Sequence, residues 1–222
     1  MELQKKTHHC QVVLFLLYGV FCYTGFMNNT FERKSPEVEA MERDHDFEQL
    51  INSYEQDKSE AGQYIEYNLP YPKELFLKYL TEKKDFLLHG SGEDFDTLEP
   101  QQANDAHKES GNKKAVYAVT DTVFPIFYAI KDRGKINGSV TSGRTEKDGT
   151  VTYEFGMPKS AIEQNPYKDG VIYILNKSDF TPEYDDGEPS NEWTSAHPVK
   201  PWAKLKVTPE DFQYMDKVIT LE

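Results

Sequence analysis

Cysteine is almost absent from this chain of 222 residues. The two cysteines, Cys10 and Cys22, both lie within the first 26 residues. The rest of the chain therefore has no thiol for a disulfide, a thiolate zinc site or a cysteine nucleophile. This absence excludes redox chemistry and cysteine catalysis from residues 27–222. It leaves the cellular compartment open, because a domain without cysteine folds in either redox environment.

Positive charge is also scarce. The chain has 25 Lys and Arg residues against 38 Asp and Glu residues, which gives a formal net charge of -13 at pH 7. Nucleic-acid affinity depends largely on lysine and arginine contacts to phosphates, so the field of this chain opposes it. We therefore expect no nucleic-acid partner, and the acidic charge favours a small molecule or a basic protein instead.

Several motifs of hydrolytic and metal-dependent enzymes are missing. The sequence contains neither His-Glu-x-x-His nor Gly-x-Ser-x-Gly. Ser91 lies between two glycines, but it would need a base such as His107 or His197 brought to it by the fold. We therefore do not expect a serine hydrolase, and we expect no metal site.

Only one long apolar run is present, at residues 11–26, and it follows Lys5 and Lys6. A basic start before an apolar segment is typical of a signal peptide or a membrane anchor, although the run is short for a spanning helix, which needs about 20 residues. The alternative is that translation starts at Met27. The first interpretation predicts a secreted or membrane-anchored protein, with membrane contact only through residues 11–26, and the second predicts a cytoplasmic one.

Downstream of this run we predict a polar linker at residues 27–45 and a single domain at residues 46–222, a size that suits one hydrophobic core. Apolar residues recur at helical spacing twice near the start of this domain, which predicts two leading helices. The first stripe is Phe47, Leu50, Ile51 and Tyr54; the second, after Pro72, is Leu75, Phe76, Tyr79 and Leu80.

The remainder of the domain has mainly strand patterns, with one apolar helix predicted at residues 123–130 after Thr120-Asp121-Thr122. Residues 92–114 are polar and predict a long loop. Helices followed by strands indicate an α+β fold with a mostly antiparallel sheet. The predicted strands are residues 86–88, 115–119, 136–140, 150–155, 170–175 and 202–207.

The most informative motif is Leu88-His89-Gly90-Ser91, which follows directly from an apolar strand. Glycine lets a backbone come close to a ligand, and histidine offers a donor and an acceptor near neutral pH. Two later segments add to it in chain order. They are Val116-Tyr117-Ala118, followed by a helix with Tyr128, and Asn191-Glu192-Trp193.

These segments resemble the catalytic domains of the ADP-ribosyltransferase superfamily. Leu88-His89-Gly90-Ser91 resembles the His-Gly-Ser strand of poly(ADP-ribose) polymerases, and it is similar to the His-Gly-Thr of diphtheria-type toxins and rifamycin ADP-ribosyltransferases. The resemblance covers residues 86–207 and rests on short motifs in the same order. It implies a split, mostly antiparallel sheet that holds NAD as a substrate.

The resemblance also implies roles for individual residues. His89 would bond a ribose hydroxyl, the Gly90 backbone would hold the nicotinamide amide, and Tyr117 and Tyr128 would stack on the nicotinamide ring. Glu192, whose setting is similar to the Asn-Glu-Tyr of the polymerases, would stabilise an oxocarbenium-like ribose. The catalytic set is thus His89, Tyr117 and Glu192.

Two departures from the family pattern affect these roles. In the rifamycin-modifying enzymes the acidic residue comes earlier, which would point to Glu183, Asp185 or Asp186. Pro125 stands where the polymerases have a small hydroxyl residue that helps to hold the carboxamide. The identity of the acid therefore stays open between Glu192 and the earlier group.

Each candidate also has a purely structural interpretation. His89 alone would be a hydrogen-bonded histidine at a strand end, Tyr117 and Tyr128 would be core tyrosines among 14, and Glu192 would be a solvated carboxylate. Only their order and local sequence favour a site. The sequence thus predicts an NAD-binding, ADP-ribosyltransferase-like protein that transfers ADP-ribose to a protein or small-molecule acceptor. The alternative is an inactive binding module of the same fold, tethered through its apolar N-terminal run.

Overall fold

The computed structural model describes residues 34–59, 61–103, 113–185 and 187–221. The chain divides into two units, Met1–Ser35 and Pro36–Glu222, and the second holds nearly all of the described residues. The predicted apolar segment 1–26 lies outside the described residues, as does the linker up to residue 33. No helix in the described ranges is long and apolar enough to cross a membrane.

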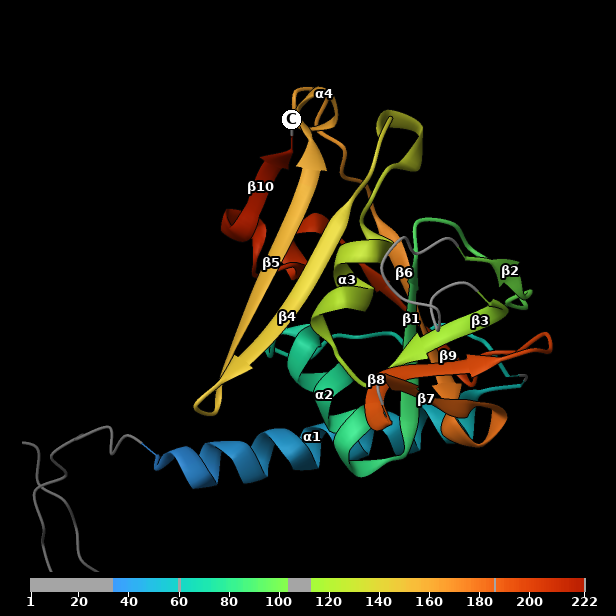
Figure 1. Ribbon diagram of the computed structural model, residues 1–222. Helices are drawn as coiled ribbons and strands as arrows, with labels where there is room; N and C mark the ends of the chain where they lie inside the picture. The colour runs from blue at the N-terminus through green and yellow to red at the C-terminus, as the bar shows by residue number, and fades with distance from the viewer. Residues whose placement is uncertain (1–33, 60, 104–112, 186, 222) are drawn as a thin grey trace, which may run out of the picture. The chain divides into compact units, whose positions relative to one another are not determined.

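The described residues of the second unit form four α-helices and ten strands, whose arrangement is drawn in Figure 1. The helices are α1 (Pro36–Asp57), α2 (Lys73–Lys83), α3 (Val123–Ala129) and α4 (Lys159–Ile162). The strands are β1 (Phe86–Ser91), β2 (Gln101–Gln102), β3 (Lys114–Val119), β4 (Thr141–Lys147), β5 (Thr150–Pro158), β6 (Gly170–Asn176), β7 (Thr181–Asp185), β8 (Glu188–Ser195), β9 (Ala203–Val207) and β10 (Val218–Leu221).

The larger sheet has the strand order β7-β8-β3-β1-β6-β9, with the short β2 paired to β3. All of its strand pairs are antiparallel. Strand β6 lies between β1 and β9, and its Val-Ile-Tyr-Ile-Leu run is apolar on both faces, which suits a strand covered on both sides. The predicted α+β class with a mostly antiparallel sheet and two leading helices is confirmed.

A smaller sheet, in the order β10-β5-β4, lies beside the larger one (Figure 1). Strands β4 and β5 form a long hairpin whose turn contains Asp148 and Gly149, both at positive φ. Asp-Gly suits the left-handed backbone that a tight hairpin needs. Strand β10 pairs with β5 in parallel.

Two apolar clusters cover the two faces of the larger sheet. One face packs against α1, α2 and α3, through fully buried side chains such as Phe47, Phe76 and Phe127. The opposite face is covered by loops that place Leu98 and Val199 over the sheet. Burying one such aliphatic or aromatic side chain stabilises the fold by about 1.5–3 kcal/mol, so these clusters fix the sheet that carries the candidate residues.

Helix α1 begins at Pro36, ten residues earlier than the predicted helix, so the linker prediction was wrong for residues 36–45. This first part of α1 is largely exposed, and its side chains have no apolar stripe that periodicity would detect. Proline in the first helical turn, with Glu37 and Glu39 near the positive end of the helix dipole, favours a helix here without packing.

Helix α3 begins where the sequence predicted a cap. The Asp121 Oδ1 atom accepts hydrogen bonds from the backbone amides of Val123 and Phe124, at 2.8 and 3.0 Å. Its Oδ2 atom accepts a bond of 2.6 Å from the Tyr153 hydroxyl on β5. A single carboxylate therefore caps the helix and ties it to the smaller sheet.

Candidate functional site

The larger sheet opens between β1 and β3. These neighbours share a single residue pair, Leu88 with Val119, whereas β1 pairs with β6 over its whole length, from Phe86 to Ser91. Beyond Leu88, therefore, β1 continues along β6 while its other edge separates from β3. The motif His89-Gly90-Ser91 occupies this separating segment.

The His89 side chain bridges the opening. Its Nδ1 atom lies 2.7 Å from the backbone carbonyl oxygen of Tyr117 on β3. A carbonyl oxygen only accepts, so Nδ1 carries the proton and Nε2 of the neutral ring is left as an acceptor. Burial lowers the pKa of His89 below its ordinary value of 6.5, the Tyr117 carbonyl raises it, and the charge of Arg133 lowers it further. The ring is thus held neutral at neutral pH with a fixed tautomer.

This lowered pKa predicts a pH-dependent stability. As the pH falls through 6.5, His89 of the unfolded chain takes up a proton that the folded chain still excludes, so the folded state loses stability. The unfolding free energy should therefore fall more steeply from about pH 7.5 to about pH 5.5 in the wild type than in His89→Gln, as measured by urea denaturation.

The matched control for this experiment is His45→Gln, because His45 is an exposed histidine on α1 whose ring nitrogen lies 2.9 Å from the Gln49 amide nitrogen. This variant also replaces one histidine by glutamine, but at a place that does not contact the opening between β1 and β3. Parallel profiles for wild type and His89→Gln would contradict a His89 ring that the folded chain holds neutral.

Gly90 is required by packing. A Cβ atom at this position would overlap the backbone carbonyl oxygen of Pro125, because helix α3 lies directly against β1. The missing side chain of Gly90 thus lets α3 approach the sheet, and Pro125 supplies the backbone that it approaches. The contact between the Gly90 backbone and nicotinamide stays a prediction.

Tyr117 lies on β3 opposite Thr194 of β8. Its hydroxyl accepts a bond of 2.9 Å from the Lys113 amide and donates to the Lys113 carbonyl at 3.3 Å. The Lys113 ammonium, in turn, bonds both carboxylate oxygens of Glu183, at 2.7 and 2.6 Å. The structure therefore connects Tyr117 to an acidic residue through Lys113, a residue that the sequence did not indicate.

Two of the candidate acids occupy neighbouring strands. Glu192 lies on β8 opposite Val119, which is itself opposite Leu88, so the three residues form one row across β8, β3 and β1. Glu183 lies on β7 at an irregularity in the pairing with β8, and its Oε1 accepts a bond of 2.5 Å from the Thr194 hydroxyl. Asp185 is the last residue of β7, and Asp186 lies outside the described residues.

This row lies at the residue pair that joins β1 to β3, so Glu192, on β8, is one strand beyond the edge of the opening. Neighbouring strands are about 4.8 Å apart, so the Glu192 backbone is roughly 10 Å from that of Leu88. Side chains alternate between faces, which puts Glu192 and Tyr117 on the Leu88 face and His89 on the other. A molecule that contacts His89 and Glu192 together would have to lie in the opening itself.

Tyr128 lies on α3, three residues after Pro125, and its hydroxyl shares a hydrogen bond of 2.9 Å with the Ser142 hydroxyl on β4. Its ring is covered on one face by Lys131, whose Nζ atom is 3.7 Å from the ring centroid. Tyr128 thus lies on the helix that packs against β1, but its hydroxyl is directed to β4 and a lysine lies against its ring. The predicted stacking of Tyr117 and Tyr128 on one ligand stays a prediction.

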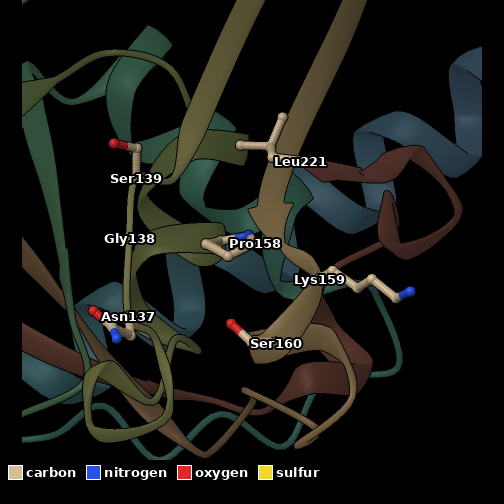
Figure 2. A pocket seen from close by; sticks show the side chains of 7 residues that line it. All are labelled: Asn137, Gly138, Ser139, Pro158, Lys159, Ser160 and Leu221. Carbon is tan, nitrogen blue, oxygen red and sulfur yellow. The ribbon is translucent and has the colours of Figure 1, made fainter.

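A hollow of about 410 Å3 lies elsewhere, at the end of the smaller sheet (Figure 2). None of the predicted site residues lines it, and Figure 2 shows the Lys159 side chain directed away from the others. Among the lining residues that the structure describes, no charged group is therefore aimed into this hollow. Its lining residues are Asn137, Gly138, Ser139, Pro158, Lys159, Ser160 and Leu221.

Within the part of the chain that the structure describes, no three His, Cys, Asp or Glu residues gather closely enough to hold a metal ion. Comparison of the chain with protein-family models, with curated proteins and with solved structures finds no match. The opening between β1 and β3, where the sequence-predicted His89 and Tyr117 meet, is therefore the feature from which a function can be inferred.

Sequence reasoning missed three polar residues around this region: Lys113, Thr194 and Lys131. Lys113 and Thr194 have no motif around them, and only the pairing of β3 with β8 and β7 brings them to Tyr117 and Glu183. For Lys131, the sequence did contain an indication of burial. It follows the apolar run Val123 to Ile130 directly, where a lysine has little water around it.

Proposed function

We propose that residues 36–222 bind NAD in the opening between β1 and β3, as an ADP-ribosyltransferase-like protein. The observation that carries this proposal is the position of His89, which bridges the opening with a fixed tautomer and a bond of 2.7 Å to the Tyr117 carbonyl. The separation of β1 from β3 after Leu88 supports it further, because the family resemblance implies a split sheet that holds the dinucleotide.

The chemistry of His89 suits a ribose. With the proton fixed on Nδ1, the free Nε2 accepts a hydrogen bond from a hydroxyl group. A neutral imidazole also avoids repulsion from the cationic nicotinamide ring, and the lowered pKa keeps the ring neutral. His89 would thus orient the ribose next to nicotinamide without changing its own charge.

Glu192 is the carboxylate that we assign to the reaction. In the bond-breaking step, the bond from the ribose C1 atom to nicotinamide breaks and its electron pair leaves with nicotinamide. The ribose then carries oxocarbenium character, which a carboxylate stabilises electrostatically. A nucleophile of the acceptor supplies the electron pair for the new bond at C1 and loses its proton. Glu192 is favoured over Glu183 because it lies in the row of Leu88 and Val119.

An inactive binding module of the same fold is the second candidate. It is favoured by the contact of Lys131 with Tyr128, because the Nζ atom, 3.7 Å from the ring centroid, occupies a face on which nicotinamide would stack. Stacking there would require Lys131 to move. Release of nicotinamide from NAD separates the two candidates, since only the enzyme produces it.

The proposal is tested by titrating the full chain with NAD and following its thermal unfolding. NAD at about 100 times its Kd should stabilise the folded chain by about 2.7 kcal/mol. His89→Ala should weaken binding at least tenfold, which corresponds to about 1.4 kcal/mol, the size of one lost hydrogen bond.

His45→Ala is the matched control, because it removes an exposed histidine from α1. This variant should bind NAD as the wild type does. A wild-type chain that NAD does not stabilise at millimolar concentration, or a folded His89→Ala variant with unchanged affinity, would contradict the proposal.

A further inference from the structure

Lys131 is a buried lysine in an aromatic environment. It follows α3 and is only 6% exposed. Its Nζ atom lies 3.7 Å from the ring centroid of Tyr128 and 5.2 Å from that of Phe127. Among the described residues, no carboxylate or other hydrogen-bond acceptor pairs with this amine, and the Nζ atom itself keeps some solvent-accessible surface. Burial without such a partner disfavours the ammonium, for which the faces of the Tyr128 and Phe127 rings are the remaining favourable contact.

A second lysine, Lys204 on β9, has almost the same exposure, 5%, but a different environment. Its ammonium lies 2.8 Å from an oxygen of Asp94 and 3.7 Å from an oxygen of Asp96. Lys204 is therefore buried as one half of an ion pair. The two lysines are equally buried and differ in whether a carboxylate lies beside the amine. Comparing their reactivity therefore shows what the missing counter-charge does apart from burial.

The charges around Lys131 act in the same direction as burial. Burial lowers the pKa of Lys131 to about 7, and the positive charge of Arg133 lowers it as well. The Lys168 side chain and the Lys131 backbone both lie beside Gly92. The nearby carboxylate of Glu93 is paired with the Lys168 ammonium at 2.7 Å, so it is not a counter-charge for Lys131. Tyr167, which bridges to Lys131 through the backbone, has a raised pKa through burial and is neutral.

We propose that Lys131 is a nucleophilic lysine that forms an imine with a small aldehyde or 2-oxo acid bearing an anionic group. A desolvated lysine beside another cation is a recognised form of activated amine. The anionic group is inferred from Arg133, which is exposed and has no carboxylate partner among the described residues. The small size follows from the 6% exposure, which admits only a compact reagent.

The step balances without any further reactant. The lone pair of Nζ attacks the carbonyl carbon, the C–N bond forms, and the electron pair of the C=O bond moves to oxygen. After proton transfer from nitrogen to oxygen, water leaves and the C=N bond forms. The product is either neutral or an iminium that keeps the favourable contact with the Tyr128 ring. Imine formation at Lys131 does not require NAD, but nicotinamide stacked on the same face of Tyr128 would compete with it.

The test is to treat the full chain with glyoxylate and cyanoborohydride at pH 7 and to quantify labelled lysines by peptide mass spectrometry. At this pH about half of an amine with a pKa near 7 is neutral, against roughly 0.03% for an ordinary lysine. Lys131 should be labelled at least tenfold faster than Lys204, which is equally buried, and than Lys159, whose side chain is 74% exposed.

Two comparisons complete the experiment. Lys131→Arg should remove the fast label while the chain stays folded by circular dichroism, and Arg133→Gln should reduce the rate with glyoxylate more than the rate with acetaldehyde. Labelling of Lys131 no faster than that of Lys204 in the folded wild type would overturn the proposal. Equal rates of labelling by glyoxylate and acetaldehyde in the wild type would overturn the inference that the carbonyl compound carries an anionic group.

Discussion

Gly90→Ala is expected to destabilise the chain by more than about 3 kcal/mol, beyond the usual range for overpacking. The added methyl group would overlap the Pro125 carbonyl oxygen, which belongs to the backbone of α3 and cannot rotate away as a side chain would. Helix α3 would have to move off β1, and the packing of Ile126 and Phe127 against the sheet would be lost with it. Urea denaturation of wild type and variant measures the difference.

Gly143→Ala provides the control, because a Cβ atom at Gly143 on β4 has nothing within 4 Å. This variant should stay within about 0.5 kcal/mol of the wild type. If Gly90→Ala also stays within about 1 kcal/mol, then α3 does not pack against β1 as described, and the glycine of the His-Gly-Ser motif has another purpose.

The elements that sequence predicted well are those in which burial leaves a pattern. The run Val171 to Leu175 is apolar at every position because both faces of β6 are covered, and the stripe from Phe47 to Tyr54 marks the side of α1 that packs on the core. Strand β4 is different. Its residues are almost all exposed, so no periodicity marks it, and the strand predicted at residues 136–140 begins only at Thr141.

For the candidate site, the sequence predicted which residue types are present and their order along the chain, but not the contacts between them. His89 could be placed at the end of an apolar strand, but its bond to the Tyr117 carbonyl depends on how far β1 and β3 stay paired, which no local pattern encodes. The same holds for Lys113 and Glu183, which are 70 residues apart and meet only because β7 and β8 extend the sheet. Contacts of this kind follow from tertiary pairing.

Glu192→Gln is expected to reduce the rate of nicotinamide release from NAD about 100-fold to 1,000-fold, the effect of removing one group that stabilises transition-state charge. Glutamine keeps the shape of the side chain and removes its charge. NAD affinity should change less than about threefold, because the ribose becomes cationic only in the transition state. Single-turnover measurement of nicotinamide, together with an NAD titration, separates the two quantities.

Glu183→Gln is the matched variant, since Glu183 is a second carboxylate on the same side of the sheet. It is engaged by Lys113 and Thr194, so its loss should lower the stability of the β7–β8 edge and leave nicotinamide release within about tenfold of the wild type. If the effects are reversed, the catalytic carboxylate is Glu183. The row through Leu88, Val119 and Glu192 would then fail to identify the acid, and the reacting ribose would lie nearer to Tyr117 than to His89.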